Sequence, residues 1–419
     1  MKDSNTKKVK HINKKTLIVT LDIGKKVHYG YMRTPTGAEV TSFPFHNARK
    51  GFNELWDKVC QFKRAQGLKD IVVGFESTGP YAEPLFHFLR KKPLHLVQVN
   101  PLHSKKLKEL TGNSPCKTDK KDPRVIADII SLGHALTLVV PEGAAAHLRR
   151  LTQARERAIQ RRTAMLNQLQ HLVFVLFPEF LNVLKNVHSK TSLYLLQHHP
   201  TPQDIVAVGS ESLALILRRV SRGKVSRERA RQLFEAAQAS VGITEGRESI
   251  LVEVKHLLAA IEHEDHLIHD VEEQMNYYVQ QIPYSHSMLS IKGMGIITVA
   301  GLIGEVGNFE TFSTIAEIMK LAGLDLYEVS SGNHRGRHHI SKRGRALMRK
   351  LLYFAALSVV RKKGIMHEDY QKMLARGMPK IKALVAISRK LLRLVFALAR
   401  DHTVYVNNYC QKSTLEIAA

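Results

Sequence analysis

The stretch TLIVTLDI, residues 16–23, decides how the first part of this 419-residue chain folds. It is rich in β-branched residues and has no helical period, so it predicts a buried β-strand that ends at a carboxylate, Asp22. Residues 27–32 and 38–45 flank the turn signal Pro35-Thr36-Gly37, which predicts a hairpin. The three segments together predict the first strands of one sheet.

Helical spacing begins after residue 46. Asn47 is a candidate N-cap, and it is followed by apolar residues at helical spacing: Phe52, Leu55, Trp56, Val59 and Phe62. The chain then alternates between short apolar strands (71–75 and 96–100) and helical segments (81–90, 105–110 and 123–132). A hairpin followed by alternating strands and helices is the ribonuclease-H-like order. We therefore expect an α/β fold, with helices on both faces of a mixed sheet.

Two long helical segments with heptad spacing bracket residues 190–245, which we interpret as an insert. In residues 147–176, one apolar stripe is regular, but the second is broken by Arg155 and Arg162. In residues 248–278, one stripe is interrupted only by Glu264. The pattern predicts an antiparallel hairpin or a dimerising coiled coil. The basic outer face of the first segment is either an ordinary solvated face or a surface that tracks phosphates; it carries Arg149, Arg150, Arg157 and Arg161.

The chain contains 63 Lys and Arg residues against 37 Asp and Glu residues, a formal net charge of +26. This excess favours a polyanionic partner, nucleic acid before an anionic membrane, over a merely basic soluble protein. A hydrophobic content of 44% excludes global disorder. The longest apolar run, residues 351–360, is far shorter than the ~20 residues that span a bilayer, so we expect no membrane segment. The N-terminus has no apolar core of a secretory signal.

The three cysteines, Cys60, Cys116 and Cys410, lack metal-binding or redox spacing, which favours a reducing cytoplasm.

Four carboxylates carry the first candidate site. Asp22 and Glu76 end two predicted strands, and Asp119 and Asp122 lie three residues apart before the helix at 123–132. Carboxylates grouped in this way repel one another unless cations bridge them, and Mg²⁺ prefers such oxygen ligands. Two ions could activate an attacking oxygen and stabilise the leaving oxygen of a phosphodiester. The alternative is that these acids are turn, N-cap and first-turn residues.

The C-terminal part carries two further candidate features. Lys292-Gly293-Met294-Gly295 before a helical segment at 296–303 is similar to a helix-hairpin-helix turn, which presents backbone N–H groups to a phosphate; a plain connecting turn is the alternative. Residues 329–344 are polar and very basic, and they begin with Ser330-Ser331-Gly332. A serine beside Arg and Lys side chains could attack a DNA phosphate, or the loop could only grip phosphates. Helical spacing returns at 345–360 and 381–399.

Taken in order, these motifs resemble the DEDD transposases of the insertion-sequence one-ten family, which includes the Piv-type DNA invertases. The resemblance covers nearly the whole chain. The matching segments are LDIGK at 21–25, ESTGPY at 76–81, VNP at 99–101, KTDKKD at 117–122, IKGMG at 291–295, residues 312–323, SSG at 330–332 and ISKRG at 340–344.

The resemblance implies a DNA recombinase or transposase with a RuvC-like N-terminal domain. The implied Mg²⁺ ligands and catalytic acids are Asp22, Glu76, Asp119 and Asp122. A catalytic serine in the C-terminal domain would form a covalent phosphoserine link to DNA. We favour Ser331 over Ser330, because Ser331 directly precedes Gly332.

The resemblance also implies partners. These are donor and target DNA, a structured bridge RNA encoded by the element, and further copies of the chain in a dimer or tetramer. A bacterial, cytoplasmic protein associated with the nucleoid is expected. The expected nucleic-acid contacts are Lys292, Gly293, Gly295, Arg335, Arg337, Lys342 and Arg343.

The expected organisation has five parts: a flexible basic tail (1–15), the RuvC-like domain (16–145), a helical coiled-coil spacer (146–282) with an insert near 190–245, a mainly α-helical C-terminal domain with a helix-hairpin-helix (283–400) and a C-terminal tail (401–419). Two other functions compete with a transposase. A hydrolytic RuvC-like nuclease, such as a junction resolvase, needs only the acidic tetrad, and a non-enzymatic coiled-coil scaffold for nucleic acid needs neither the tetrad nor the serine. The presence of both favours the transposase.

Overall fold

The computed structural model describes residues 12–76, 79–111, 122–328, 336 and 338–407. The chain forms two compact units, Met1–Val139 and Val140–Ala419, and each is described by itself. In the described part of the chain, we find no helix that is both long and apolar enough to cross a membrane.

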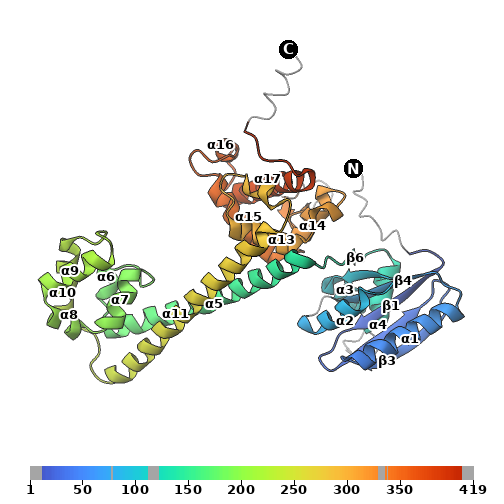
Figure 1. The fold of residues 1–419 in the computed structure, drawn as a ribbon, viewed down its shortest axis with the longest axis horizontal. Helices are drawn as coiled ribbons and strands as arrows, with labels where there is room; N and C mark the ends of the chain where they lie inside the picture. The colour runs from blue at the N-terminus through green and yellow to red at the C-terminus, as the bar shows by residue number, and fades with distance from the viewer. Residues whose placement is uncertain (1–11, 77–78, 112–121, 329–335, 337, 408–419) are drawn as a thin grey trace, which may run out of the picture. The chain divides into compact units, whose positions relative to one another are not determined.

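The N-terminal unit is built on one mixed sheet with the strand order β3-β2-β1-β4-β5-β6 (Figure 1). Its strands are β1 (Thr16–Asp22), β2 (Val27–Arg33), β3 (Glu39–His46), β4 (Asp70–Glu76), β5 (His95–Val99) and β6 (Leu136–Thr137). The central strands β1, β4 and β5 are parallel, whereas β2, β3 and β6 run antiparallel to their neighbours. The predicted strands and the mixed sheet are confirmed, and the short edge strand β6 is an addition.

Helices cover both faces of this sheet. On one face, α1 (Arg49–Ala65) and α2 (Glu83–Leu89) pack on the odd-numbered residues of β1, including Leu17 and Leu21. On the other face, α3 (Pro101–Thr111) and α4 (Asp122–Ser131) pack on Ile18 and Val72. A 3-10 turn, Pro80–Ala82, precedes α2. The strand order and the two helical layers are consistent with the predicted ribonuclease-H-like fold.

The prediction that Asn47 caps the first helix is wrong. The N-cap of α1 is Ala48, and no side chain caps this helix end. Nδ2 of Asn47 instead donates to two carbonyl oxygens in other loops, that of Lys25 at 3.3 Å and that of Tyr81 at 3.2 Å. A partner 34 residues further along the chain draws this side chain away from the helix.

The C-terminal unit contains two 34-residue helices, α5 (Gly143–Leu176) and α11 (Arg247–Gln280), which lie side by side (Figure 1). Ion pairs give their direction: Nε of Arg155 lies 2.6 Å from Glu272, and Nε of Arg162 lies 2.5 Å from Asp265. Partners later in α5 are earlier in α11, so the two helices form an antiparallel hairpin. The two arginines that broke the apolar stripe of α5 therefore contact α11 through charge.

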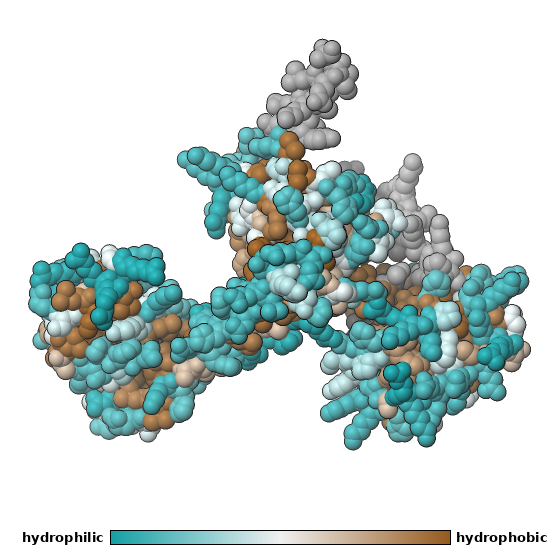
Figure 2. All heavy atoms as spheres, in the orientation of Figure 1, coloured by the Kyte–Doolittle hydropathy of each residue, from teal (hydrophilic) through white to brown (hydrophobic). Residues whose placement is uncertain are grey.

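The interruption of the α11 stripe at Glu264 has the same origin. Glu264 is only 5% exposed. Its two carboxylate oxygens accept hydrogen bonds from Nε and Nη2 of Arg161, at 2.6 and 2.8 Å. This pairing with Arg161 lowers the pKa of Glu264. Arg161 is thus engaged in a structural pair, although most of the face of the hairpin seen in Figure 2 is hydrophilic.

Short helices lie between the two long ones, where the sequence shows short helical patterns. They are α6 (Phe180–Val183), α7 (Lys190–His198), α8 (Pro202–Val208), α9 (Ser210–Val220) and α10 (Arg227–Gln238). They share one apolar core with the end of α5 and the start of α11, through residues such as Leu176, Leu213 and Val254. The proline-bearing turn is a capping box, in which Thr201 and Asp204 each accept a hydrogen bond from the other's backbone N–H.

The C-terminal unit also contains α17 (Lys380–Asp401), which buries one whole face, together with further elements, several of which pack on it. They are α12 (Ser285–Leu289), α13 (Ile296–Val306), the 3-10 turn Phe309–Thr311, α14 (Ile315–Ala322), α15 (Ala346–Val359), α16 (His367–Ala375) and a ribbon of β7 (Leu326–Tyr327) with β8 (His339–Ile340). Helix α13 packs directly on α5.

Candidate functional site

The parallel pairing of β1 and β4 brings the first two predicted carboxylates together. The register pairs Leu21 with Phe75, so the next residues, Asp22 and Glu76, end the two strands side by side. Neighbouring strands lie about 4.8 Å apart. Residues in register on parallel strands point to the same face of the sheet. Asp22 and Glu76 are two positions beyond Thr20 and Gly74, so they share the face that α4 covers. Both are partly exposed at the end of their strands.

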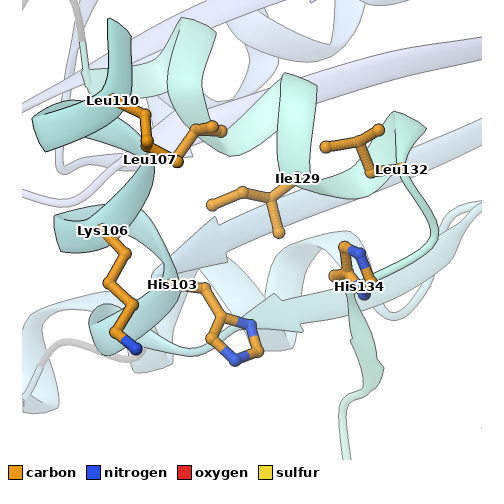
Figure 3. A pocket seen from close by; sticks show the side chains of 7 residues that line it. All are labelled: His103, Lys106, Leu107, Leu110, Ile129, Leu132 and His134. Carbon is orange, nitrogen blue, oxygen red and sulfur yellow. The ribbon is translucent and has the colours of Figure 1, made fainter. Parts of the chain in front are cut away.

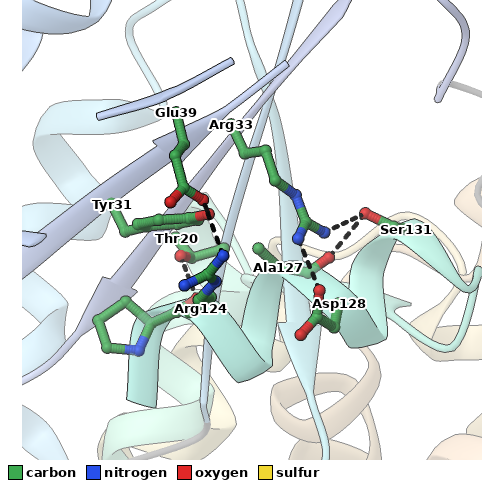
Figure 4. Close-up of polar contacts among 9 residues, drawn as sticks. Thr20, Tyr31, Arg33, Glu39, Arg124, Ala127, Asp128 and Ser131 are labelled. Carbon is green, nitrogen blue, oxygen red and sulfur yellow. Dashed lines mark hydrogen bonds and ion pairs between the residues drawn. The ribbon is translucent and has the colours of Figure 1, made fainter. Parts of the chain in front are cut away.

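Helix α4 begins at this same edge of the sheet. The hydroxyl of Thr20, on β1, donates to the carbonyl oxygen of Pro123 at 2.5 Å (Figure 4). Asp122 is the first residue of α4 and precedes Pro123. A direct bond therefore places the backbone of Asp122 close to the carboxyl end of β1. Asp119 lies outside the described residues.

Polar contacts from β2 and β3 hold the rest of α4 in place (Figure 4). Arg33 donates to Asp128 at 2.6 Å and to the hydroxyl of Ser131 at 2.9 Å. Glu39 lies 3.4 Å from Arg124 and accepts a hydrogen bond from the hydroxyl of Tyr31. Burial, together with this bond to Glu39, raises the pKa of Tyr31 to about 12. Since Tyr31 stays protonated, it remains a donor across the physiological range.

This arrangement fits a divalent metal ion. Two carboxylates at the ends of adjacent parallel strands offer the oxygen ligands that Mg²⁺ prefers, and the helix that begins beside them starts at Asp122. Within the described residues alone, no cluster of three or more metal-ligating side chains occurs.

Gly24 closes the turn that follows Asp22. A Cβ on Gly24 would lie 2.1 Å from the carbonyl oxygen of Val27, so only glycine fits there. Its N–H donates to Nδ1 of His28 at 3.2 Å. The turn after the first carboxylate is therefore tight and is held by a buried imidazole.

A separate apolar pocket of about 280 Å³ lies between α3 and α4 (Figure 3). Leu107, Ile129 and Leu132 form its apolar walls, and His103 and His134 lie at its edge. Ile129 is seven residues from Asp122, or about 10 Å along the helix at 1.5 Å per residue. The pocket is thus at the other end of α4 from the carboxylates and contains none itself.

The glycine turn of the C-terminal unit has an exposed side and a buried side. Lys292, Gly293 and Gly295 are exposed, whereas Ile291 and Met294 are buried. Gly293 has a φ of +104°, which favours glycine, and Gly295 is the N-cap of α13. The two buried side chains anchor the turn, and the exposed backbone lies at the N-terminus of α13.

The predicted serine segment lies outside the described residues: Ser330, Ser331, Arg335 and Arg337 all fall there. Its base is described. Antiparallel pairing of Leu326 with Ile340 and of Tyr327 with His339 closes the loop. Lys342 and Arg343 follow β8 and are exposed. The ribbon thus brings both ends of the serine segment together.

Two partly buried arginines support this base, and no motif of the sequence points to them. Nη1 of Arg349 donates to the carbonyl oxygens of Ala322 and Gly344, at 2.9 and 3.0 Å. Arg345 pairs with Glu305, which is 3% exposed. Burial, with the nearby charge of Arg149, lowers the pKa of Arg345 to about 10, against the opposing effect of Glu305. These arginines bind protein groups, and no pattern in the sequence separates them from arginines that face a ligand.

A ribonuclease-H-like sheet with acids at the ends of β1 and β4 and at the start of α4 defines a DEDD-type domain. Two family models match the chain: one described as a transposase over residues 19–178, and one described as the transposase IS116/IS110/IS902 family over residues 285–371. Together they cover more than half of the chain, and the chain belongs to this family of insertion-sequence transposases.

Similar proteins agree with this assignment. An uncharacterized 43.6 kDa protein of insertion element IS110 from Streptomyces coelicolor is 24% identical over 388 residues, 92% of this chain and 94% of the relative. An uncharacterized 44.8 kDa protein of insertion element IS116 from Streptomyces clavuligerus is 24% identical over 69% of this chain and 72% of the relative. The transposase of insertion sequence element IS1111A from Coxiella burnetii is 27% identical over 40% of this chain and 46% of the relative.

Proposed function

We propose that this protein is the transposase of an insertion sequence, and that it cuts and exchanges DNA strands at a site built on Asp22, Glu76, Asp119 and Asp122. The observation that carries the proposal is the shared face and register of Asp22 and Glu76 at the ends of β1 and β4, with α4 beginning beside them. Four acids at one edge would repel DNA by themselves, so a divalent cation, Mg²⁺ by its preference for oxygen ligands, belongs to the proposal.

In this proposal the four carboxylates would hold Mg²⁺, and the bound ion would supply positive charge to the phosphodiester and to its leaving oxygen. The hydroxyl of Ser331 attacks the phosphorus atom. The Oγ–P bond forms as a P–O bond of the DNA backbone breaks. The serine loses its proton, and the leaving oxygen of the cut strand gains one, so that the strand leaves as a hydroxyl with no net change in protons. Reversal of this step with a different strand end completes the exchange. The β7–β8 ribbon supports the role proposed for this serine, because it holds the two strands that flank the serine segment together.

Nucleic acid would contact basic groups of the C-terminal unit. Lys292 and the exposed backbone of Gly293 and Gly295 lie at a helix N-terminus, which favours a phosphate. Lys342 and Arg343 are exposed beside the serine segment, and Arg335 and Arg337 belong to that segment. We further propose that a structured bridge RNA selects the donor and target DNA, and that the protein acts as a dimer or tetramer.

An assay for the covalent adduct tests the chemistry. The full-length protein is incubated with labelled donor DNA and Mg²⁺ and is then separated on a denaturing gel. We expect a protein–DNA adduct that Ser331→Ala abolishes and that Ser330→Ala, the matched control, retains. Strand cleavage without an adduct would instead support a hydrolytic nuclease.

Two further measurements test the cation and the RNA. Asp22→Ala should abolish Mg²⁺-dependent cleavage, and full activity of the parent protein in excess chelator would reject the metal site. Sequencing of RNA that co-purifies with the protein should return one structured RNA species from the element. Recovery of random cellular RNA alone would count against the guide.

A further inference from the structure

A hydrogen-bonded junction links the loops that follow the two strand-end carboxylates. The backbone N–H of Asn47 donates to the carbonyl oxygen of Lys26 at 2.9 Å. Nδ2 of its side chain donates to the carbonyl oxygens of Lys25 and Tyr81. Lys25 and Lys26 belong to the turn after Asp22. Tyr81 lies in the 3-10 turn that follows Glu76. One amide therefore bridges the two segments that leave the proposed metal site.

His28 forms the second half of the junction. It is fully buried on β2, between the rings of Phe45 and Phe52, at centroid distances of 5.1 and 6.3 Å. Its Nδ1 accepts the hydrogen bond from the N–H of Gly24, which requires an unprotonated Nδ1 and places the ring proton on Nε2. The imidazole thus holds the residue two positions after Asp22.

Two buried atoms of this junction complement each other. Nε2 of His28 and Oδ1 of Asn47 are both buried, and neither atom has a hydrogen-bond partner within the described residues. Burial lowers the pKa of His28, and the nearby side chain of Asn47 raises it by a smaller amount. One atom is a donor and the other an acceptor, and a buried polar atom without a partner is costly.

We propose that His28 and Asn47 are positioning residues of the metal site: together they hold the loops after Asp22 and Glu76 in one arrangement, and so set the spacing of the two carboxylates. The inference rests on the proposed function, since it concerns the carboxylates assigned there to Mg²⁺. Neither side chain needs to contact the ion. Each acts through the backbone of the segment that follows a ligand, as outer hydrogen bonds commonly orient metal ligands.

The chain contains a matched control for Asn47. Nδ2 of Asn13 donates to Asp70 at 3.3 Å, and its Oδ1 accepts from the N–H of Lys15 at 2.7 Å. Asn13 thus links the segments at the opposite ends of the same two strands, β1 and β4. Asn13→Ala removes the same kind of amide contact but leaves the carboxylate edge unchanged.

The experiment measures metal binding directly. Mn²⁺ is titrated into the full-length protein, and free Mn²⁺ is followed by electron paramagnetic resonance, while Tm is recorded without metal. Asn47→Ala should weaken Mn²⁺ binding about 10-fold or more. Asn13→Ala should bind Mn²⁺ like the parent protein. His28→Phe keeps the ring between Phe45 and Phe52 but removes the acceptor for Gly24, so it should weaken binding in the same direction, and it remains informative if Asn47→Ala does not fold.

The outcomes separate the two levels of the proposal. No Mn²⁺ binding by the parent protein would reject the metal site and the proposed function with it. Binding by the parent protein that Asn47→Ala and His28→Phe leave unchanged would overturn the junction alone. If Asn13→Ala weakens Mn²⁺ binding as much as Asn47→Ala does, the loss of affinity reflects a general loosening of the sheet, and this result would also overturn the inference.

Discussion

Gly304→Ala tests the close approach of α13 to α5. A Cβ on Gly304 would lie 2.6 Å from the backbone nitrogen of Arg149 and 2.9 Å from the carbonyl carbon of Leu148. Ordinary van der Waals contact begins at 3.4 Å, so the two helices would have to separate by several tenths of an ångström. Both contacts are with backbone, which cannot rotate away as a side chain can. The added methyl group must therefore move a whole helix.

The expected magnitude follows from two opposing terms. Overpacking of a well-filled contact costs about 1–3 kcal/mol. Alanine is more favourable than glycine in a helix by roughly 1 kcal/mol, which offsets part of that cost. The difference is a net loss of at most about 2 kcal/mol of unfolding free energy, which corresponds to a fall in Tm of at most about 8 °C.

Gly301→Ala is the matched control, one turn earlier in α13. A Cβ on Gly301 would lie 2.4 Å from Cδ1 of Leu351, and the Leu351 side chain can change rotamer to make room. The helical gain should then cancel most of the cost, with little change in Tm. Thermal unfolding followed by circular dichroism measures both variants. A Tm for Gly304→Ala equal to or above that of Gly301→Ala would refute the close backbone contact.

Three other predictions concern buried polar groups. Arg161→Met should lower Tm more than Glu264→Leu does. The first variant leaves the buried Glu264 carboxylate without its partner, whereas the second leaves the Arg161 guanidinium, which water can reach. Equal losses of Tm in thermal unfolding would contradict this prediction. Burial lowers the pKa of His28 below 6.5, so as the pH falls the unfolded state takes up the imidazole proton before the folded state does. The free energy of unfolding of the N-terminal unit, measured with urea, should therefore decrease as the pH drops below about 6.5. His28→Phe removes the titrating group and should make this decrease smaller. Thr20→Val removes the buried hydrogen bond to Pro123 at the start of α4. It should lower Tm, because the Pro123 carbonyl oxygen loses its donor, and it should also shift Mg²⁺-dependent DNA cleavage to higher Mg²⁺ concentration. Cleavage with an unchanged dependence on Mg²⁺ concentration would contradict a role of α4 in the proposed site.

The local sequence pattern was sufficient to predict most strands of the N-terminal sheet and the two long helices. The run that became β1 was predicted to within one residue, because a central strand buried on both faces carries apolar and β-branched residues instead of an alternating pattern. The position of Asp22 and Glu76 at strand ends was also visible, since a carboxylate after such a run is unusual. Their side-by-side arrangement required the register of β1 on β4, which no single segment contains.

Side chains that pair over long sequence distances were the ones that pattern misjudged. Asn47 has the residue type and place of an N-cap, but its bonds to Lys25 and Tyr81 depend on how two loops meet. Arg161 belongs to a face that the sequence left open as either solvated or phosphate-tracking, and its side chain binds Glu264, 103 residues away. Charge at a given position does not reveal whether its partner is water, protein or DNA.

The sequence by itself determined the strands, the helices and the acids at their ends, because burial and capping act within a few residues of each position. Only the tertiary structure decided which of those groups meet. It places Asp22 beside Glu76 and the start of α4 through β-sheet register and the Thr20 bond, and it joins α5 to α11 through ion pairs. The physical reason is that pairing energies depend on distance in space, and residues such as Arg155 and Glu272 become neighbours only after the chain has folded back on itself.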